Sequence, residues 1–170
     1  MTGSLTRRKT LMVWEKRAIM NLWNNQYPEK ISYTNFDSFD HYLKSLKKPR
    51  HYLLYDNKDL LGWCSTFQRG RDRWFIIILN GSVHGKGLGR WLLNNAKSEE
   101  VTLNGWVIDY EGELRKNGQL YYSPLIFYIK QSFKIMPEER LSFSGMSAVK
   151  IRWTPILRSK NRSKQLWSGL

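Results

Sequence analysis

The stretch His84-Gly85-Lys86-Gly87-Leu88-Gly89-Arg90 lies between an apolar segment, 74–79, and a segment with the pattern of an amphipathic helix. Glycines allow tight turns and let the backbone approach a ligand closely. The start of the following helix offers unpaired N–H groups and the positive end of the helix dipole. Lys86 and Arg90 add cationic charge at the same place. We therefore interpret the stretch as a phosphate-binding loop at a strand-to-helix junction.

Two other kinds of glycine-rich loop fit these residues less well. The Walker A pattern requires Ser or Thr after its lysine, but Lys86 is followed by Gly87. A dinucleotide-binding fingerprint is the stronger alternative, because the next predicted strand ends in Asp109, an acid about 20 residues further on. Its third glycine would coincide with Arg90, however, and its first would follow the strand directly. A dinucleotide-binding protein therefore stays the lesser alternative.

The composition indicates a folded, basic protein. The chain has 170 residues, which suits one domain, and we assign 1–156 to that domain and 157–170 to a basic C-terminal tail. The net charge of +14 predicts an anionic partner without identifying it. One cysteine and three scattered histidines give neither a disulfide nor metal-ligand spacing. We expect a cytoplasmic protein that has no metal site and no membrane segment.

Hydrophobic periodicity predicts helices that alternate with strands. The expected helices cover 14–25, 36–46, 88–97 and 123–132, and the expected strands cover 11–13, 51–55, 60–67, 74–79, 101–109, 133–141 and 148–153. The sequence Asp56-Asn57-Lys58-Asp59 is typical of a turn, so the strands on either side of it should pair antiparallel. The apolar segment 74–79 predicts a strand in the centre of the sheet.

Two motifs and the order of the elements point to a known family. His84 to Gly89 matches the pattern R/Q-x-x-G-x-G/A except at its first position, and Ser123 to Phe133 is similar to an A-x-x-x-Y-x-x-x-GF theme with Tyr128 at the tyrosine. On these grounds the chain resembles the GNAT superfamily of N-acetyltransferases. The resemblance implies an α+β fold of three layers. Its central, mostly antiparallel sheet has six or seven strands with one parallel pair, flanked by about four helices.

The resemblance also implies acetyl-coenzyme A as cosubstrate, with its pyrophosphate on the N–H groups from Gly85 to Arg90. The pantetheine arm would enter a gap between strands 74–79 and 101–109, which Leu79 and Val83 would line. The residues implied in cofactor binding are Leu79, Val83, His84, Gly85, Lys86, Gly87, Leu88, Gly89, Arg90 and Ser123. No metal is implied.

Two residues are candidates for proton transfer. Tyr128 matches the family position of the acid that protonates the leaving thiolate, and Tyr121 and Tyr122 are nearby substitutes. An amine must lose a proton before it attacks, and we choose Asp109, at the end of its strand, as the first candidate base. Glu111 and Glu113 follow it in a charged loop.

The leading hypothesis is an N-acetyltransferase that moves an acetyl group from acetyl-CoA to a primary amine by direct attack, through a tetrahedral intermediate. The acceptor is left open among a small molecule, a peptide and an RNA-linked amine. The alternative is a basic nucleic-acid-binding module without catalysis, suggested by the charge, by the arginines at 69, 71 and 73, and by eight tryptophans. Weak nucleic-acid binding would also be compatible with the enzyme. The sequence leaves the oligomeric state open, a homodimer included.

Overall fold

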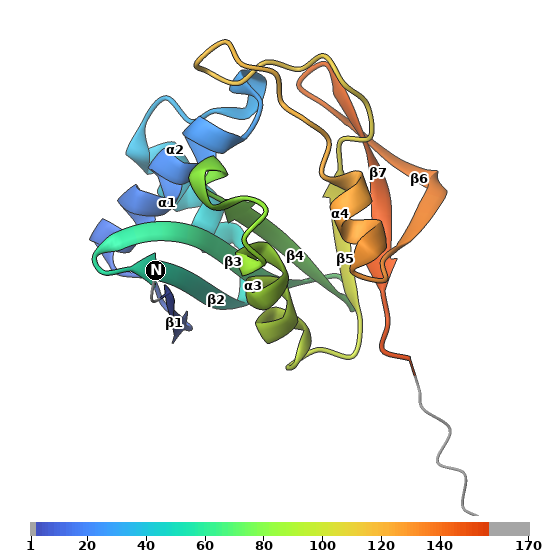
Figure 1. The fold of residues 1–170 in the computed structure, drawn as a ribbon, viewed down its shortest axis with the longest axis horizontal. Coiled ribbons are helices and arrows are strands. Elements are labelled where there is room, and N and C mark those ends of the chain that lie inside the picture. The colour runs from blue at the N-terminus through green and yellow to red at the C-terminus, as the bar shows by residue number, and fades with distance from the viewer. Residues whose placement is uncertain (1–2, 157–170) are drawn as a thin grey trace, which may run out of the picture.

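Seven strands form one sheet in the order β1-β2-β3-β4-β5-β7-β6 in the computed structural model, which describes residues 3–156 (Figure 1). The strands are β1 Gly3–Arg8, β2 Lys47–Asp56, β3 Asp59–Arg69, β4 Asp72–Leu79, β5 Leu103–Val107, β6 Lys134–Phe143 and β7 Met146–Trp153. The α-helices are α1 Val13–Gln26, α2 Phe36–Ser45, α3 Leu88–Lys97 and α4 Leu125–Lys130, and short 3-10 helices cover Glu29–Ile31 and Gly81–Val83. None of the described helices is long and apolar enough to cross a membrane.

All neighbouring strands are antiparallel except β4 and β5, which are parallel. This confirms the predicted fold class, including the seven strands and the parallel pair. The predicted hairpin between β2 and β3 is present, with Asn57 at a φ of 54°. β4 is the fourth of the seven strands, so the central place predicted for it is also confirmed.

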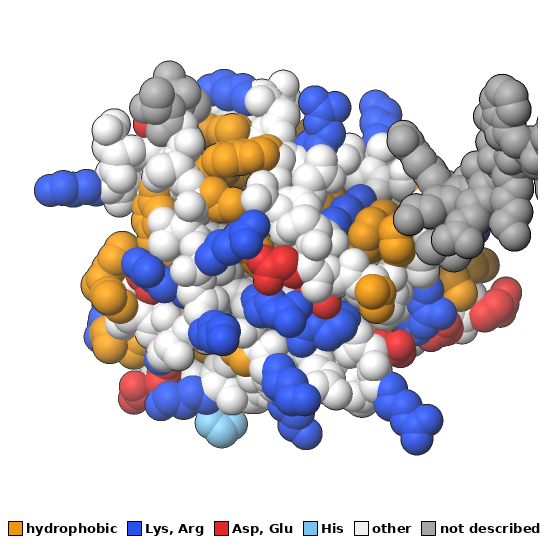
Figure 2. All heavy atoms as spheres, turned by 90° about the horizontal axis from the view of Figure 1, so that it is seen from below, with side chains coloured by type: hydrophobic (Ala, Val, Ile, Leu, Met, Phe, Trp, Pro, Cys, Tyr) orange, Lys and Arg blue, Asp and Glu red, His pale blue; other side chains and the backbone are white. Residues whose placement is uncertain are grey.

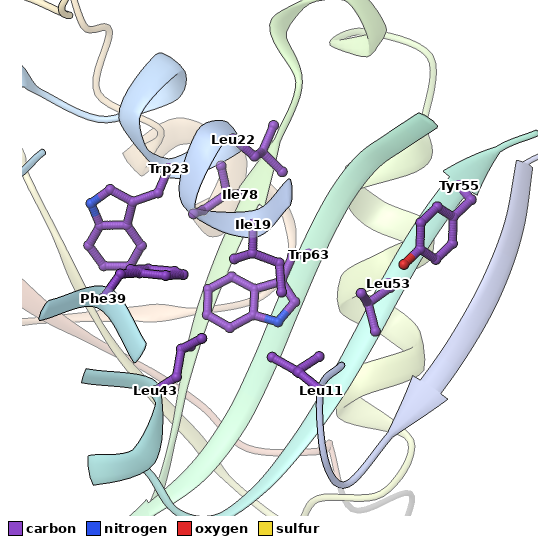
Figure 3. Close-up of a cluster of buried hydrophobic side chains, with 10 residues drawn as sticks. All are labelled: Leu11, Ile19, Leu22, Trp23, Phe39, Leu43, Leu53, Tyr55, Trp63 and Ile78. Atoms are coloured by element: carbon purple, nitrogen blue, oxygen red, sulfur yellow. The ribbon is translucent and has the colours of Figure 1, made fainter. Parts of the chain in front are cut away.

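The helices cover both faces of the sheet. On one face α1 and α2 enclose a core of large side chains, in which Ile19 and Trp63 are fully buried (Figure 3). On the other face α3 packs on β2 and β3, where Leu92 and Ala96 are fully buried. Helix α4 joins a third cluster on the same face, over β4, β5 and β7. The molecule therefore has three layers.

The parallel pair is closed at one end only. A single bridge, Trp74 to Asn104, joins β4 to β5. The buried Asn104 amide donates to the Arg73 carbonyl at 3.0 Å, and its oxygen accepts from Arg152 of β7 at 2.8 Å. One side chain thus ties three strands together at this end. Beyond the bridge β4 continues to Leu79 without a partner on its β5 side, and the two strands diverge (Figure 1).

Three local expectations differ from the structure. The segment 11–13 is not a strand, because Glu15 accepts the Met12 N–H at 2.8 Å and so caps the start of α1, while the first strand lies earlier, over Gly3–Arg8. Lys47 does not end α2 but opens β2. Ser123 does not act as a simple cap of α4, since Pro124 is the residue that precedes the helix. The proposed tail, 157–170, lies outside the described residues.

The divergence of β4 and β5 depends on a glycine, which gives a test of the fold. A Cβ on Gly105 would lie 2.7 Å from Cε1 of the buried Phe75 ring. That ring is held between Tyr128 and Phe133 and cannot move aside freely. We expect Gly105→Ala to lower the free energy of unfolding by about 1–3 kcal/mol in urea titrations. Gly3→Ala, whose Cβ would meet its nearest atom at 3.4 Å, is the control and should cost less. Equal stability of the two variants would contradict this packing.

Candidate functional site

The glycine-rich loop has a backbone that only glycine adopts readily. Gly85 and Gly87 have φ values of 74° and 78°, in the left-handed region. Gly87 is also the residue from which α3 starts, because its carbonyl accepts the Trp91 N–H at 3.0 Å. The two glycines therefore turn the chain from the end of β4 into the helix.

The turn leaves a row of N–H groups available. Among the described residues, the structure gives no hydrogen-bond acceptor to the backbone N–H groups of 85–90. Three of them belong to the first turn of α3, where the helix dipole is positive. The side chains of Lys86 and Arg90 are exposed beside them. This arrangement suits a phosphate or pyrophosphate group, as the sequence predicted.

The loop is fixed to β4 and α4 through close contacts. A Cβ on Gly89 would lie 3.5 Å from the Phe127 ring of α4 and 3.6 Å from the Leu79 side chain. The Leu79 carbonyl is 3.1 Å from Nε2 of His84, so His84 folds back onto the end of the strand. The structure thus brings α4 to the loop and the end of β4, from which it is distant in the sequence.

Two of the predicted cofactor-binding residues, Val83 and Ser123, have structural roles in the fold. Val83 is buried in the core with Leu92 and Ala96 of α3, and it is not among the residues that line the cavity described below. The Ser123 hydroxyl donates to the Ile108 carbonyl at 2.6 Å and accepts the Leu125 N–H at 3.3 Å. It therefore connects the end of β5 to the start of α4.

A cavity of about 510 Å³ lies where β4 and β5 diverge. Its walls include Tyr27, which follows the end of α1, Tyr42 of α2, Phe75 of β4, Trp106 of β5 and Tyr128 of α4. Phe75 and Tyr128 belong to the α3/α4 face, whereas α1 and α2 lie on the opposite face. The cavity therefore extends through the sheet between the strands. The Tyr27 hydroxyl donates to the Ile77 carbonyl at 3.3 Å and so crosses the opening.

Tyr128 of α4, the residue predicted for proton donation, lies on the wall of this cavity and is 7% exposed. Its ring packs edge-on against Phe75 and Phe133. Burial, with a smaller contribution from Tyr121, raises the pKa of the Tyr128 phenol well above its usual value. The phenol is therefore protonated at neutral pH and can donate a proton, but it cannot accept one.

Asp109 is engaged elsewhere. Its carboxylate accepts two hydrogen bonds from Arg140 of β6, at 2.8 and 3.1 Å. These bonds lower the pKa of Asp109. Asp109 does not line the cavity, and neither do Glu111 and Glu113. Glu113 instead binds Lys30 and the Tyr110 hydroxyl. A carboxylate so held is a weak base, and the geometry argues against Asp109 in that role.

Sequence reasoning missed the aromatic walls of the cavity. Trp23, Tyr27 and Trp74 are not among the site residues predicted from the sequence, and the arginine at 69 enters there only with those at 71 and 73. The available signal was the density of aromatic residues, 14% of the chain. Which of them meet around one cavity depends on tertiary packing, because they come from α1, α2, β3, β4, β5, α4, β6 and the loops between such elements.

The basic surface does not by itself form a nucleic-acid site. Figure 2 shows lysines and arginines spread over the face seen from below in Figure 1, with a few acidic side chains among them. Arg73, one of the three arginines in question, is bound to Glu100 and Thr66. Three tryptophans, Trp23, Trp63 and Trp74, are buried and cannot stack on bases. The described residues also contain no cluster of three His, Cys, Asp or Glu that could hold a metal.

Solved structures with this fold are acyltransferases. An aminoglycoside 6'-N-acetyltransferase complexed with coenzyme A has a TM-score of 0.67 at 15% identity, with 91% of this chain and 98% of that chain covered. An acyl-CoA N-acyltransferase from Pseudomonas aeruginosa has a TM-score of 0.65 at 13% identity, with 89% and 99% covered. A ribosomal-protein-alanine N-acetyltransferase from Escherichia coli has a TM-score of 0.61 at 15% identity, with 94% and 98% covered. At these identities the likeness concerns the fold.

The amino-acid sequence of the chain matches one model of a protein family. No curated protein sequence matches the chain. The model described as "Acetyltransferase (GNAT) family" matches residues 16–102, just over half of the chain, and this span includes β4, the glycine-rich loop and α3. With the parallel pair, the loop and the cavity between the strands in place, the chain belongs to the GNAT family of acetyltransferases.

Proposed function

We propose that the protein is an N-acetyltransferase that moves the acetyl group of acetyl-CoA to a primary amine. The observation that carries the proposal is the row of N–H groups at 85–90, in a structure that also has a cavity between β4 and β5 with Tyr128 on its wall. Membership in the acetyltransferase family supports the donor, because the family uses acetyl-CoA. The dinucleotide alternative loses its basis with that membership.

The loop fits the pyrophosphate of coenzyme A. N–H groups in the first turn of α3 would bind its oxygens, and the helix dipole adds typically 0.3–1 kcal/mol. Lys86 and Arg90 are placed to add charge-assisted hydrogen bonds. His84 stands in the first position of the motif, but its ring is held against the Leu79 carbonyl, so we assign it to fixing the loop.

The open edge of β4 suits the pantetheine arm. Beyond Trp74 this strand has no partner on its β5 side, and an amide-bearing chain can pair with such an edge as a strand would. The arm would bring the thioester into the cavity through the opening between the strands. The acetyl group would then lie near Phe75 and Tyr128, on the α3/α4 side.

Tyr128 is the residue that we propose for proton transfer. The neutral amine nitrogen forms a bond to the acetyl carbon and loses a proton to water, and the carbon–sulfur bond of the tetrahedral intermediate breaks. Tyr128, which is protonated at neutral pH, donates its phenolic proton to the departing sulfur and is reprotonated from solvent; its place on the cavity wall supports this role, because the raised pKa makes it a weaker acid than a free phenol. We propose Asp109 as a positioning residue rather than the base, because its ion pair with Arg140 joins the end of β5 to β6 beside the cavity.

The first prediction tests the loop. Gly87→Glu places a carboxylate among the N–H groups, and we expect it to abolish the rise in melting temperature that coenzyme A gives the native chain. A ligand at about 100 times its dissociation constant adds about 2.7 kcal/mol, so the rise is measurable. Gly118→Glu is the matched control, since Gly118 has the same φ of 78° in an exposed loop. An unchanged shift in Gly87→Glu would reject the loop as the coenzyme site.

The second prediction tests Tyr128. Tyr128→Phe keeps the ring packing and removes the proton, so we expect kcat to fall by about 100-fold or more. Coenzyme A binding should stay within a factor of two or so of the native chain. The rate is measured as release of the coenzyme A thiol, with the best acceptor from a panel of alkyl amines, aryl amines and peptides. Tyr122→Phe, at an exposed position, should leave kcat unchanged. A native kcat in Tyr128→Phe would exclude it as the acid.

A further inference from the structure

The chemistry of the cavity restricts the acceptor. More than half of the residues that line it are aromatic, and several of them, such as Trp23 and Tyr42, lie on the α1/α2 side of the sheet. Such walls bind flat apolar groups well. The volume of about 510 Å³ lies within the range of small-molecule sites. A ring of the acceptor therefore has both the space and the surroundings that it needs.

One cation lies on this aromatic wall. The Arg69 guanidinium is 4.8 Å from the centre of the Trp74 ring and 5.6 Å from that of Phe67. Within residues 3–156 it has no acidic partner, whereas the nearby Arg73 binds Glu100. Aromatic faces hold the position of Arg69 without neutralising its charge. The Arg69 side chain is exposed, so an acceptor that enters the cavity can reach it, and a carboxylate or similar anionic group on that acceptor would pair with the guanidinium.

No Asp, Glu or His is among the described residues that line the cavity. The tyrosines cannot replace them as bases, because burial raises the pKa of Tyr121 to about 12 and raises the pKa of Tyr27 and Tyr42 as well. An alkyl amine with a pKa of about 10.4 would have to lose its proton here without help. A polycationic acceptor would meet a cation and no anion. Both classes fit the cavity poorly.

We propose that the acceptor is a small aromatic amine that is neutral at physiological pH and carries an anionic group, which binds Arg69. This inference rests on the proposed acetyl transfer to an amine. The neutral nitrogen needs no base before it bonds to the acetyl carbon. Its proton passes to water as the carbon–sulfur bond breaks, and Tyr128 protonates the sulfur and is reprotonated from solvent. The substrate class thus differs from that named for the aminoglycoside acetyltransferase with the same fold.

The test uses the full chain with acetyl-CoA and three probes, followed by thiol release. The probes are 4-aminobenzoate, its ethyl ester, which lacks the anionic group, and kanamycin, a polycation. We expect kcat/KM for 4-aminobenzoate to exceed that for the ester at least tenfold, and no turnover of kanamycin. Arg69→Met should remove this preference by raising KM for 4-aminobenzoate, with the ester unaffected. Arg71→Met, exposed in the same turn and outside the cavity lining, is the matched control.

The outcomes separate this inference from the function on which it rests. If coenzyme A raises the melting temperature but kanamycin or a peptide α-amine is the better acceptor, the acceptor class is wrong and the acetyltransferase stands. The same conclusion follows if Arg69→Met lowers kcat/KM equally for the acid and the ester, or if coenzyme A binds and 4-aminobenzoate is not acetylated. If coenzyme A does not bind, the proposed function itself fails.

Discussion

The single parallel contact between β4 and β5 is the constraint on which the rest of the structure depends. One bridge, from Trp74 to Asn104, closes the pair, and the Asn104 side chain adds hydrogen bonds to β4 and β7 at the same point. Because a buried amide must satisfy its polar atoms, this end of the pair is fixed. The other end has no such tie, so β4 keeps an open edge and a cavity forms beside it. The opening is thus a consequence of where the hydrogen bonding stops.

The features on either side of this opening serve different purposes. On the α3/α4 side the backbone provides the chemistry: glycines at positive φ, unpaired N–H groups and a helix dipole. On the α1/α2 side the side chains provide it, in the form of aromatic rings and one arginine. In the function that we propose, the first arrangement would bind the phosphates of coenzyme A whatever the acceptor, and the second would select the acceptor. A shared fold with acetyltransferases of other substrates is compatible with this division, since the selecting residues differ from the binding loop.

Net charge turned out to be a poor guide to the site. The arginines at 69, 71 and 73 are close together in the sequence, but the structure gives two of them different contacts. Arg73 is bound to Glu100, whereas Arg69 stacks on Trp74. Asp109, attractive as a base at the end of a strand, is bound to Arg140 from a strand formed about 30 residues later. Such pairings are made by chain segments that meet only on folding. No local pattern contains them.

The sequence by itself determined the alternation of helices and strands and the place of Tyr128 on a helix, because these rest on local periodicity. It also determined the hairpin at Asn57 and the loop at Gly85 and Gly87, because their backbone conformations are ones that few residue types adopt. Only the tertiary structure decided that Val83 is core, that Ser123 joins β5 to α4, and that aromatic residues from seven helices and strands surround one cavity. The physical reason is that burial and pairing of side chains depend on which segments pack together, and that is settled by the sheet order and the divergence of β4 from β5.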